Sequence, residues 1–415
     1  RMGNKKSMNI RKPEVLAPAG DWERFQFALQ YGADAIYLGG KQFTMRAAPA
    51  NFTAEQLAAA VQLAHAKGVK VYLTCNTLPH NADLPQFLPY LREMAETGID
   101  AVIVADLGLL ALIRKALPDL EIHMSTQMGI VNYETANALY DLGVKRVVLA
   151  RELSLEEIAE IRAKTPADLE LEAFVHGAMC VSFSGRCLLS AYLTGRDANQ
   201  GACAQPCRWK YRLMEETRPG QYFPVEEHDE GTYIMNAKDL CMIDHIPELL
   251  AAGVDSLKLE GRAKSSYYVA VVTNAYRSAV DAYLQQPEGF VLPEWIREEV
   301  YKVSHRGYCT GFFFGKPEAG QRYTDNSYDR SFDVIAIADD WRDGMLYVTQ
   351  RNRFFAEDTV ELLAPERQPI TIPLNGNLFD ETGERITVAN HAMMACAFPC
   401  PVEVPKGTIV RKRAE

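Results

Sequence analysis

Four cysteines in the middle of the chain offer the most distinctive chemistry in this sequence. Cys180 and Cys187 are followed by Cys203 and Cys207, so four of the nine cysteines fall within 28 residues. Thiolates are soft ligands that zinc and iron–sulfur clusters select. The Cys-x3-Cys pair lies in a stretch with Gly and Pro, where a loop can turn both sulfurs toward one point. This spacing predicts a bound metal centre.

Two other interpretations of these thiols are disulfides and inert buried cysteines. Disulfides require an oxidising compartment, and the polar, basic residues 1–10 contain no apolar segment of the kind found in signal peptides. No apolar run is long enough to cross a bilayer. We therefore expect a cytoplasmic protein without a membrane partner. The spacing leaves zinc and an iron–sulfur cluster both open.

The other cysteines are expected to serve packing. Cys396 and Cys400 repeat the Cys-x3-Cys spacing, but no further thiol lies near them in sequence. Cys75, Cys241 and Cys309 stand alone, as is typical of packed thiols. Cys241 is the best substitute ligand if one of the four clustered cysteines does not bind.

Composition and charge limit the classes of partner. The chain has 415 residues, 48% of them hydrophobic, which is enough for about two or three folding units. There are 44 basic and 54 acidic residues, a net charge of −10, which argues against a protein that coats nucleic acid nonspecifically. A polyanion must therefore meet a local patch. The best candidate patch follows Cys207 and consists of Arg208, Trp209 and Lys210.

The first 262 residues alternate short β-branched runs with helical patterns, roughly every thirty residues. Two helical stretches open with capping boxes, at Thr53 to Gln56 and at Ser154 to Glu157. Eight such strands predict an α/β fold, a TIM-like (β/α)8 barrel. The expected strands are residues 14–17, 35–38, 71–75, 101–105, 122–125, 146–150, 169–175 and 256–259.

Polar residues that end the strands of such a barrel surround its site. Three of them, Arg46, Arg151 and Arg262, could hold a carboxylate-bearing ligand bidentately. About half of the set is expected to bind ligand, and the rest to tether loops. The full set is Arg46, Asn76, Asp106, Gln127, Arg151, Glu152, His176, Glu260 and Arg262.

The connection after the seventh strand is expanded into an insertion, residues 177–255, that carries all four clustered cysteines. Because the loops at this end of a barrel hold its chemistry, the metal is expected above the barrel mouth. Asn236, Lys238 and Asp239 could line the cavity. The acidic stretch 226–230 is more typical of a solvated loop.

Domain boundaries follow from a change of pattern near His305. From residue 332 onward, short alternating runs are separated by Asp-Gly and Asn-Gly turns, which predicts a small antiparallel β-barrel. We expect a frayed tail at 1–12, the barrel with its insertion at 13–324, and the β-domain at 325–415.

Several motifs resemble the collagenase-like U32 peptidase family. They are Glu172-x-Phe-x-His-Gly-Ala-x-Cys180, Ser184-Gly-x-Cys187, Cys203-x3-Cys207-Arg208 and Leu257-Lys-Leu-Glu-Gly-Arg262. Residues 13–20, 151–158 and 305–308, with the C-terminal β-domain, also look like the TrhP-type branch of tRNA hydroxylation proteins. The resemblance covers nearly the whole chain.

The resemblance implies hydroxylation of the wobble uridine of tRNA to 5-hydroxyuridine, with prephenate as a probable co-substrate. It also implies a [4Fe-4S] cluster held by Cys180, Cys187, Cys203 and Cys207. On this hypothesis tRNA is the partner, and the candidate site residues have three different roles. The roles are substrate binding for Arg46, Asn76, Gln127, Arg151, Asn236, Lys238 and Asp239, catalysis for His176, Glu260 and Arg262, and RNA binding for Arg208, Trp209 and Lys210.

Two alternatives from other classes stay open. A metal-dependent or cysteine peptidase needs an activated nucleophile or a metal-bound water. The sequence has neither a Gly-x-Ser-x-Gly elbow nor a His-Glu-x-x-His helix, and His176 could activate Cys180 only if that thiol were free of metal. The other alternative is a noncatalytic, cluster-bearing scaffold for a partner enzyme.

Overall fold

The computed structural model describes residues 11–45, 50–180, 182–209, 227–228, 231–232, 238–315 and 331–414. The tail predicted at 1–12 lies almost wholly outside these residues. The boundary predicted between 324 and 325 lies outside them too. None of the described helices combines the length and the apolarity that a bilayer-spanning segment requires.

Eight parallel strands form a closed barrel, which confirms the predicted TIM-like fold. Each strand pairs with the next, and the last strand pairs with both the seventh and the first, so the sheet has no free edge within the barrel. The strands are β1 (Glu14–Ala19), β2 (Ala35–Gly39), β3 (Lys70–Cys75), β4 (Ala101–Val104), β5 (Glu121–Met124), β6 (Arg146–Val148), β7 (Glu170–Gly177) and β11 (Ser256–Leu259).

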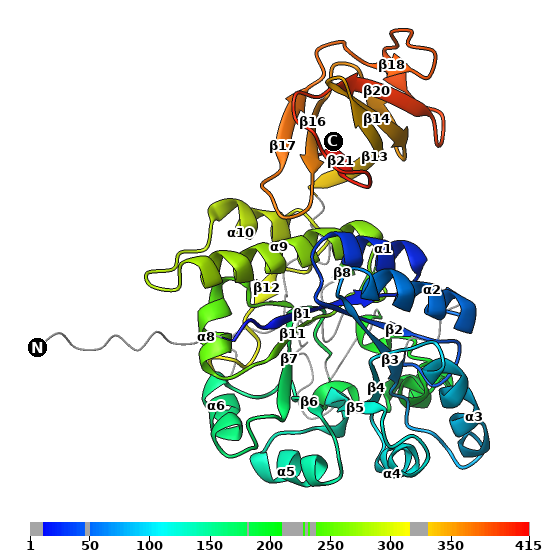
Figure 1. Cartoon of the computed structure of the whole chain (residues 1–415), viewed down its shortest axis with the longest axis vertical. Helices are drawn as coiled ribbons and strands as arrows, with labels where there is room; N and C mark the ends of the chain where they lie inside the picture. The colour runs from blue at the N-terminus through cyan, green and yellow to red at the C-terminus, as the bar shows by residue number, and fades with distance from the viewer. Residues whose placement is uncertain are drawn as a thin grey trace, which may run out of the picture.

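Helices surround the barrel (Figure 1). Both predicted capping boxes are present, at the start of α2 and of α6, where they satisfy backbone N–H groups that a helix leaves unpaired. The helices are α1 (Trp22–Gln30), α2 (Ala54–His65), α3 (Leu84–Ala95), α4 (Leu107–Ala116), α5 (Tyr133–Asp141), α6 (Leu155–Ala163), α8 (Ile246–Ala251), α9 (Ser266–Gln285) and α10 (Glu294–Tyr301).

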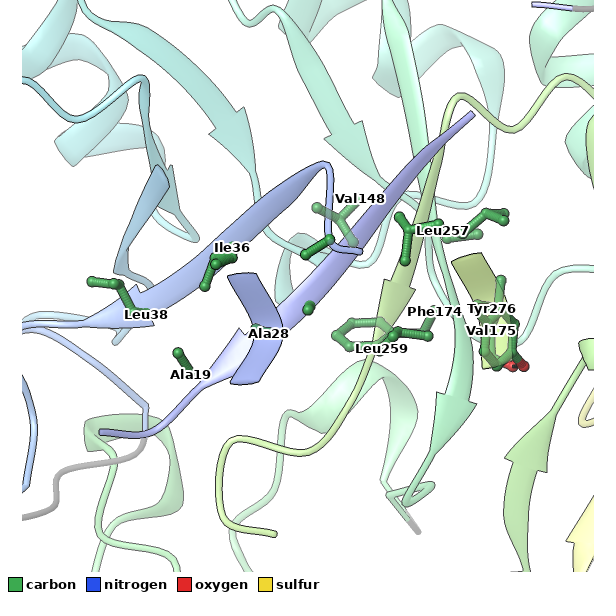
Figure 2. Packing of buried hydrophobic residues seen from close by; sticks show 14 of the residues in the cluster. Ala19, Ala28, Ile36, Leu38, Val148, Phe174, Val175, Leu257, Leu259 and Tyr276 are labelled. Carbon is green, nitrogen blue, oxygen red and sulfur yellow. Dashed lines mark hydrogen bonds between the residues drawn. The ribbon is translucent and has the colours of Figure 1, made fainter. Parts of the chain in front are cut away.

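The main core lies between the outer face of the barrel strands and the helices. Figure 2 shows Leu257 and Leu259 of β11 packed among apolar side chains, with Val175 of β7 beside Tyr276 of α9. Successive side chains of a strand point to opposite faces. Lys258, between the two leucines, therefore points into the barrel.

The insertion between β7 and β11 folds over the carboxyl end of β7. Strand β10 (Asp239–Cys241) pairs antiparallel with the end of β7, and β12 (Tyr308–Cys309) pairs with β10. These pairings place the insertion at the barrel mouth. Its other elements are η2 (Phe183–Gly185), α7 (Leu189–Thr194), η3 (Ala198–Gln200), η4 (Pro206–Arg208), β8 (Glu227–His228), β9 (Gly231–Thr232) and η5 (Ile243–His245); η1 (Thr126–Met128) follows β5.

The C-terminal domain is antiparallel, as predicted. Its main sheet has the order β17-β16-β21-β13-β14-β20-β18, whose two ends do not pair with each other among the described strands, so the domain is a half-barrel rather than a closed barrel. The strands are β13 (Phe332–Arg342), β14 (Met345–Gln350), β15 (Phe354–Phe355), β16 (Thr359–Leu363), β17 (Ile370–Pro373), β18 (Phe379–Asp380), β19 (Val388–Ala389), β20 (Ala395–Pro399) and β21 (Ile409–Arg413).

The C-terminal domain packs on the barrel beside α1, α9 and α10 (Figure 1). Arg411 is fully buried at this interface, where its guanidinium makes two hydrogen bonds to Glu299, at 2.7 and 2.8 Å, and two to Glu361, at 2.6 and 3.0 Å. The Tyr31 hydroxyl donates to the Leu363 carbonyl at 2.6 Å. The two domains therefore share a packed and hydrogen-bonded interface.

Candidate active site

A pocket of about 200 Å³ opens at the carboxyl ends of the barrel strands, where a TIM barrel holds its chemistry. All four clustered cysteines line it, together with five of the polar residues predicted from the strand ends. These five are Asn76, Gln127, Arg151, Glu260 and Arg262. The structure thus brings the predicted metal ligands and the predicted ligand-binding residues to one site.

The four cysteines are free thiols held by the insertion above the barrel mouth. Backbone N–H groups point at two of the sulfurs: Leu189 donates to Cys187 Sγ at 3.4 Å and Gln205 to Cys203 Sγ at 3.3 Å. Hydrogen bonds of this kind stabilise a thiolate and tune a metal centre that it binds. The donor set fits a thiolate-bound metal or cluster.

Arg262 is a rigid cation at the pocket wall. Its side chain is only 6% exposed, and its guanidinium donates to Thr44 Oγ1 at 2.8 Å, Thr74 Oγ1 at 3.2 Å and Asn51 Oδ1 at 3.2 Å. These partners fix the orientation of the guanidinium. The group is suited to bind an anionic ligand.

Two further donors face the same pocket. Arg151 lies over the ring of Phe174, with 3.9 Å from Cζ to the ring centroid, and donates to the Ala178 carbonyl. Gln127 is 4% exposed, and its Oε1 accepts from Ser125. Among the described residues its Nε2 has no hydrogen-bond partner. A buried donor of this kind costs free energy unless a ligand or water accepts its hydrogen bond.

Lys258 also lines the pocket, although it is not among the site residues predicted from the sequence. Its Nζ lies 2.6 Å from Glu172 Oε1 and 4.6 Å from the centre of the Tyr37 ring. Burial raises the pKa of Glu172, but Lys258 and Arg146 outweigh this and lower it overall. The sequence does contain a signal that could have predicted this position. Lys258 stands between two leucines of a buried strand, and because successive side chains of a strand point to opposite faces, the lysine points into the barrel.

His176 ends β7 but does not line the pocket. A β-bulge gives β7 one extra residue, so that Phe174 pairs with Lys258 while His176 pairs with Leu259 and turns toward α9. Its Nδ1 lies 3.3 Å from the Tyr276 hydroxyl. Burial, with the nearby charges of His305 and Lys264, lowers the pKa of His176 to about 3, so the imidazole is neutral at physiological pH.

The remaining predicted residues lie elsewhere. Asp239 is buried at the start of β10, within the insertion, where its carboxylate accepts from Arg306 at 2.9 Å, and neither Asp239 nor Lys238 lines the pocket. Trp209 is 41% exposed beside the cysteines. Three predicted residues lie outside the described part of the chain: Arg46, Lys210 and Asn236. The side chain of Arg208 lies outside it too.

The fold and the site define a class of protein: a TIM-like barrel with a cysteine-lined mouth and a C-terminal antiparallel β-domain. The family model described as Peptidase family U32 matches residues 20–323, and the model of the U32 C-terminal domain matches residues 330–411. The chain belongs to the U32 peptidase family, which confirms the resemblance seen in its motifs.

Three relatives illustrate the functions named within the family. "tRNA hydroxylation protein P1" of Bacillus subtilis (strain 168) is 37% identical, covering 99% of this chain and 97% of the relative. "tRNA hydroxylation protein P" of Escherichia coli (strain K12) is also 37% identical, covering 86% of this chain and 87% of the relative. A 23S rRNA 5-hydroxycytidine synthase of the same strain is 38% identical, covering 74% of this chain and 46% of the relative.

Proposed function

We propose that this protein is an RNA-modifying enzyme that hydroxylates the wobble uridine of tRNA to 5-hydroxyuridine. The observation that carries the proposal is the convergence of four thiols and several hydrogen-bond donors on one pocket. The proposal also draws on the relatives, since two are named tRNA hydroxylation proteins and a third is named for hydroxycytidine formation in rRNA. Hydroxylation of RNA is the chemistry that these names share.

The proposed cofactor is a [4Fe-4S] cluster bound by Cys180, Cys187, Cys203 and Cys207. Four thiols that line one pocket are the donor set that such a cluster takes, one thiolate for each iron. When bound, such a cluster supplies one-electron chemistry next to the substrate.

The proposed co-substrate is a small dicarboxylate, prephenate. Gln127, Arg151, Lys258 and Arg262 present donors or positive charge to the pocket, whereas Glu260 is the one carboxylate among its described lining residues. Such an excess of donors favours an anionic ligand. Arg262 is the strongest candidate to hold a carboxylate because its orientation is fixed by three neutral partners.

Glu260 is the proposed proton-transferring residue. It lines the pocket, and its Oε2 lies 3.4 Å from the Tyr37 hydroxyl. A carboxylate at the pocket wall can accept a proton from a base held out of its stack. His176 is a weaker candidate, since the bulge in β7 turns its ring away from the pocket.

The surroundings of His176 and Cys180 argue against the peptidase alternative. Both ring nitrogens of His176 face tyrosine hydroxyls, Tyr276 at 3.3 Å and Tyr308 at 3.5 Å. His176 is therefore not placed to deprotonate Cys180, whose Sγ instead lies 3.4 Å from Ser182 Oγ. This arrangement favours a ligand role for Cys180 over a nucleophile role.

The proposal is tested by nucleoside analysis of tRNA from cells that lack their own 5-hydroxyuridine and express this protein. Wild type is expected to produce a uridine with one added oxygen. Arg262→Ala is expected to reduce that product at least tenfold while circular dichroism shows an unchanged fold, because its guanidinium holds the anionic ligand. An unmodified uridine with wild type, or full activity in Arg262→Ala, would contradict the proposal.

A further inference from the structure

A second cavity, of about 720 Å³, lies between the barrel and the C-terminal domain. On the barrel side it is lined by α1, the start of α9 and the loop before α9. On the other side the C-terminal domain contributes Phe332, Val334, Ile337, Arg351, Asn352 and Ile409. We name this space the interdomain groove. Nothing in the proposed roles of the site residues uses it.

The groove adjoins the candidate active site. Ala178, Gln205 and Glu260 line both the groove and the smaller pocket. A ligand bound in the pocket therefore has the groove as its neighbouring space. The groove has more than three times the volume of the pocket, so it suits a part of the substrate larger than one small acid.

The walls of the groove combine cations with apolar and aromatic side chains. Arg351 of the C-terminal domain faces Glu23 of α1 across the groove, with 3.7 Å between Nη2 and Oε1. Both side chains are more than 40% exposed, so this ion pair is weak and readily exchanged for another partner. The two lysines of the groove have inward partners: Lys302 pairs with Glu299 and Glu361, and Lys264 lies 4.0 Å from Asp239 and over the Tyr268 ring. Arg351 is therefore the cation best placed to meet an incoming anion.

From this geometry we infer that the interdomain groove binds the nucleotides that flank the target base, with Arg351 contacting a phosphate. The inference rests on the proposed function. A base that enters a pocket of about 200 Å³ must leave its ribose, its phosphates and its neighbours outside. The adjoining space is the groove, whose mixed cationic and aromatic lining is typical of single-stranded RNA sites. The C-terminal domain thus forms one wall of the RNA site.

Two substitutions that break the same ion pair test this inference. Arg351→Gln is expected to weaken tRNA binding about fivefold and to lower the slope of log K against log salt concentration by about one, because one phosphate contact is lost. Glu23→Gln breaks the same contact but removes a negative charge from the groove. It is expected to tighten binding about threefold. Arg342→Gln is the matched control, an exposed arginine of the same domain outside the groove.

The measurement is the dissociation constant of an unmodified tRNA transcript, by fluorescence anisotropy over a series of salt concentrations. Opposite shifts in Arg351→Gln and Glu23→Gln, with none in Arg342→Gln, support the groove. Shifts of the dissociation constant in the same direction in both variants would reflect only the loss of the ion pair, and they would overturn the inference. Equal affinity in all variants also overturns it and leaves the groove to another partner, such as a protein. A wild-type protein that binds no tRNA overturns the proposed function and the inference together.

Discussion

At the residue scale, buried hydrogen-bond donors line the pocket, and one of them has no acceptor among the described residues. Arg262 is held by three neutral side chains, whereas the Nε2 of Gln127 has no partner among the described residues. Donors held in place in this way are preorganised, because little reorganisation is needed when an anion arrives. The donors of this pocket therefore predict affinity for a small carboxylate.

Gln127→Met tests this donor directly. Methionine has nearly the same length but cannot donate, so the variant should bind prephenate about tenfold more weakly, as expected for one lost hydrogen bond to a charged group. Isothermal titration calorimetry measures the change. Gln62→Met is the control, since Gln62 is exposed on α2 and far from the pocket in the fold, and should bind as wild type. Wild-type affinity in Gln127→Met would refute this role for Gln127.

Five polar residues of the pocket could be predicted from the sequence because they follow strands of one barrel. Asn76, Gln127, Arg151, Glu260 and Arg262 all come at or after strand ends, and all five line the pocket. The position of His176 could not be predicted in this way. A single bulge in β7 reverses the side to which its ring points, and bulges leave no regular trace in the pattern of hydrophobic residues.

At the element scale, the interior of the barrel contains a network of charged side chains. Arg146 of β6 donates to Glu14 of β1 at 2.6 Å and to Glu172 of β7 at 3.0 Å. Burial raises the pKa of Glu14, but Arg146 and hydrogen bonds from Tyr72 and Ser256 lower it to about 2. Strands far apart in sequence are thus joined by one buried cation.

This network predicts how stability depends on pH. The folded-state pKa of Glu14 lies below its unfolded value of 4.5, so its contribution is complete above about pH 4.5 and is lost as pH falls toward 2. Glu14→Gln should cost about 3 kcal/mol at pH 7, and the difference from wild type should shrink between pH 4.5 and 2. Urea unfolding at several pH values measures this. A difference that stays constant with pH would contradict it.

The elements themselves were predicted with different success. The eight barrel strands follow from apolar runs at regular intervals, and the two capping boxes follow from local sequence. Strands β10 and β12 were not predicted, because each has two or three residues and is defined by pairing with distant segments. Their pairing explains the motif at 305–308: Arg306 fixes Asp239 at the start of β10.

At the scale of the whole molecule, one buried guanidinium links the two domains. Arg411 of β21 reaches Glu299 of α10 and Glu361 of β16 with no exposure to solvent. Replacing one partner of such a group leaves buried charge without compensation. The interface also forms the interdomain groove, so its integrity matters for the proposed RNA site.

Arg411→Met should therefore loosen the interface between the domains. We expect a loss of about 3 kcal/mol in the free energy of unfolding, since Glu299 keeps Lys302 at 2.9 Å as a remaining partner. Differential scanning calorimetry, with limited proteolysis between the domains, measures this. Arg342→Met, at an arginine whose side chain is 62% exposed, should change stability by less than about 0.5 kcal/mol. Equal effects in the two variants would disprove a special role for Arg411.

We propose that four thiolates at the barrel mouth hold an iron–sulfur cluster next to the ligand pocket. Iron and sulfide analysis of protein purified without oxygen tests it most directly, with wild type, Cys203→Ser and Cys309→Ser compared. We predict about four iron and four sulfide per chain in wild type and Cys309→Ser, and loss of both in Cys203→Ser. Stoichiometric zinc in wild type, no metal at all, or a full complement of iron in Cys203→Ser would contradict the account.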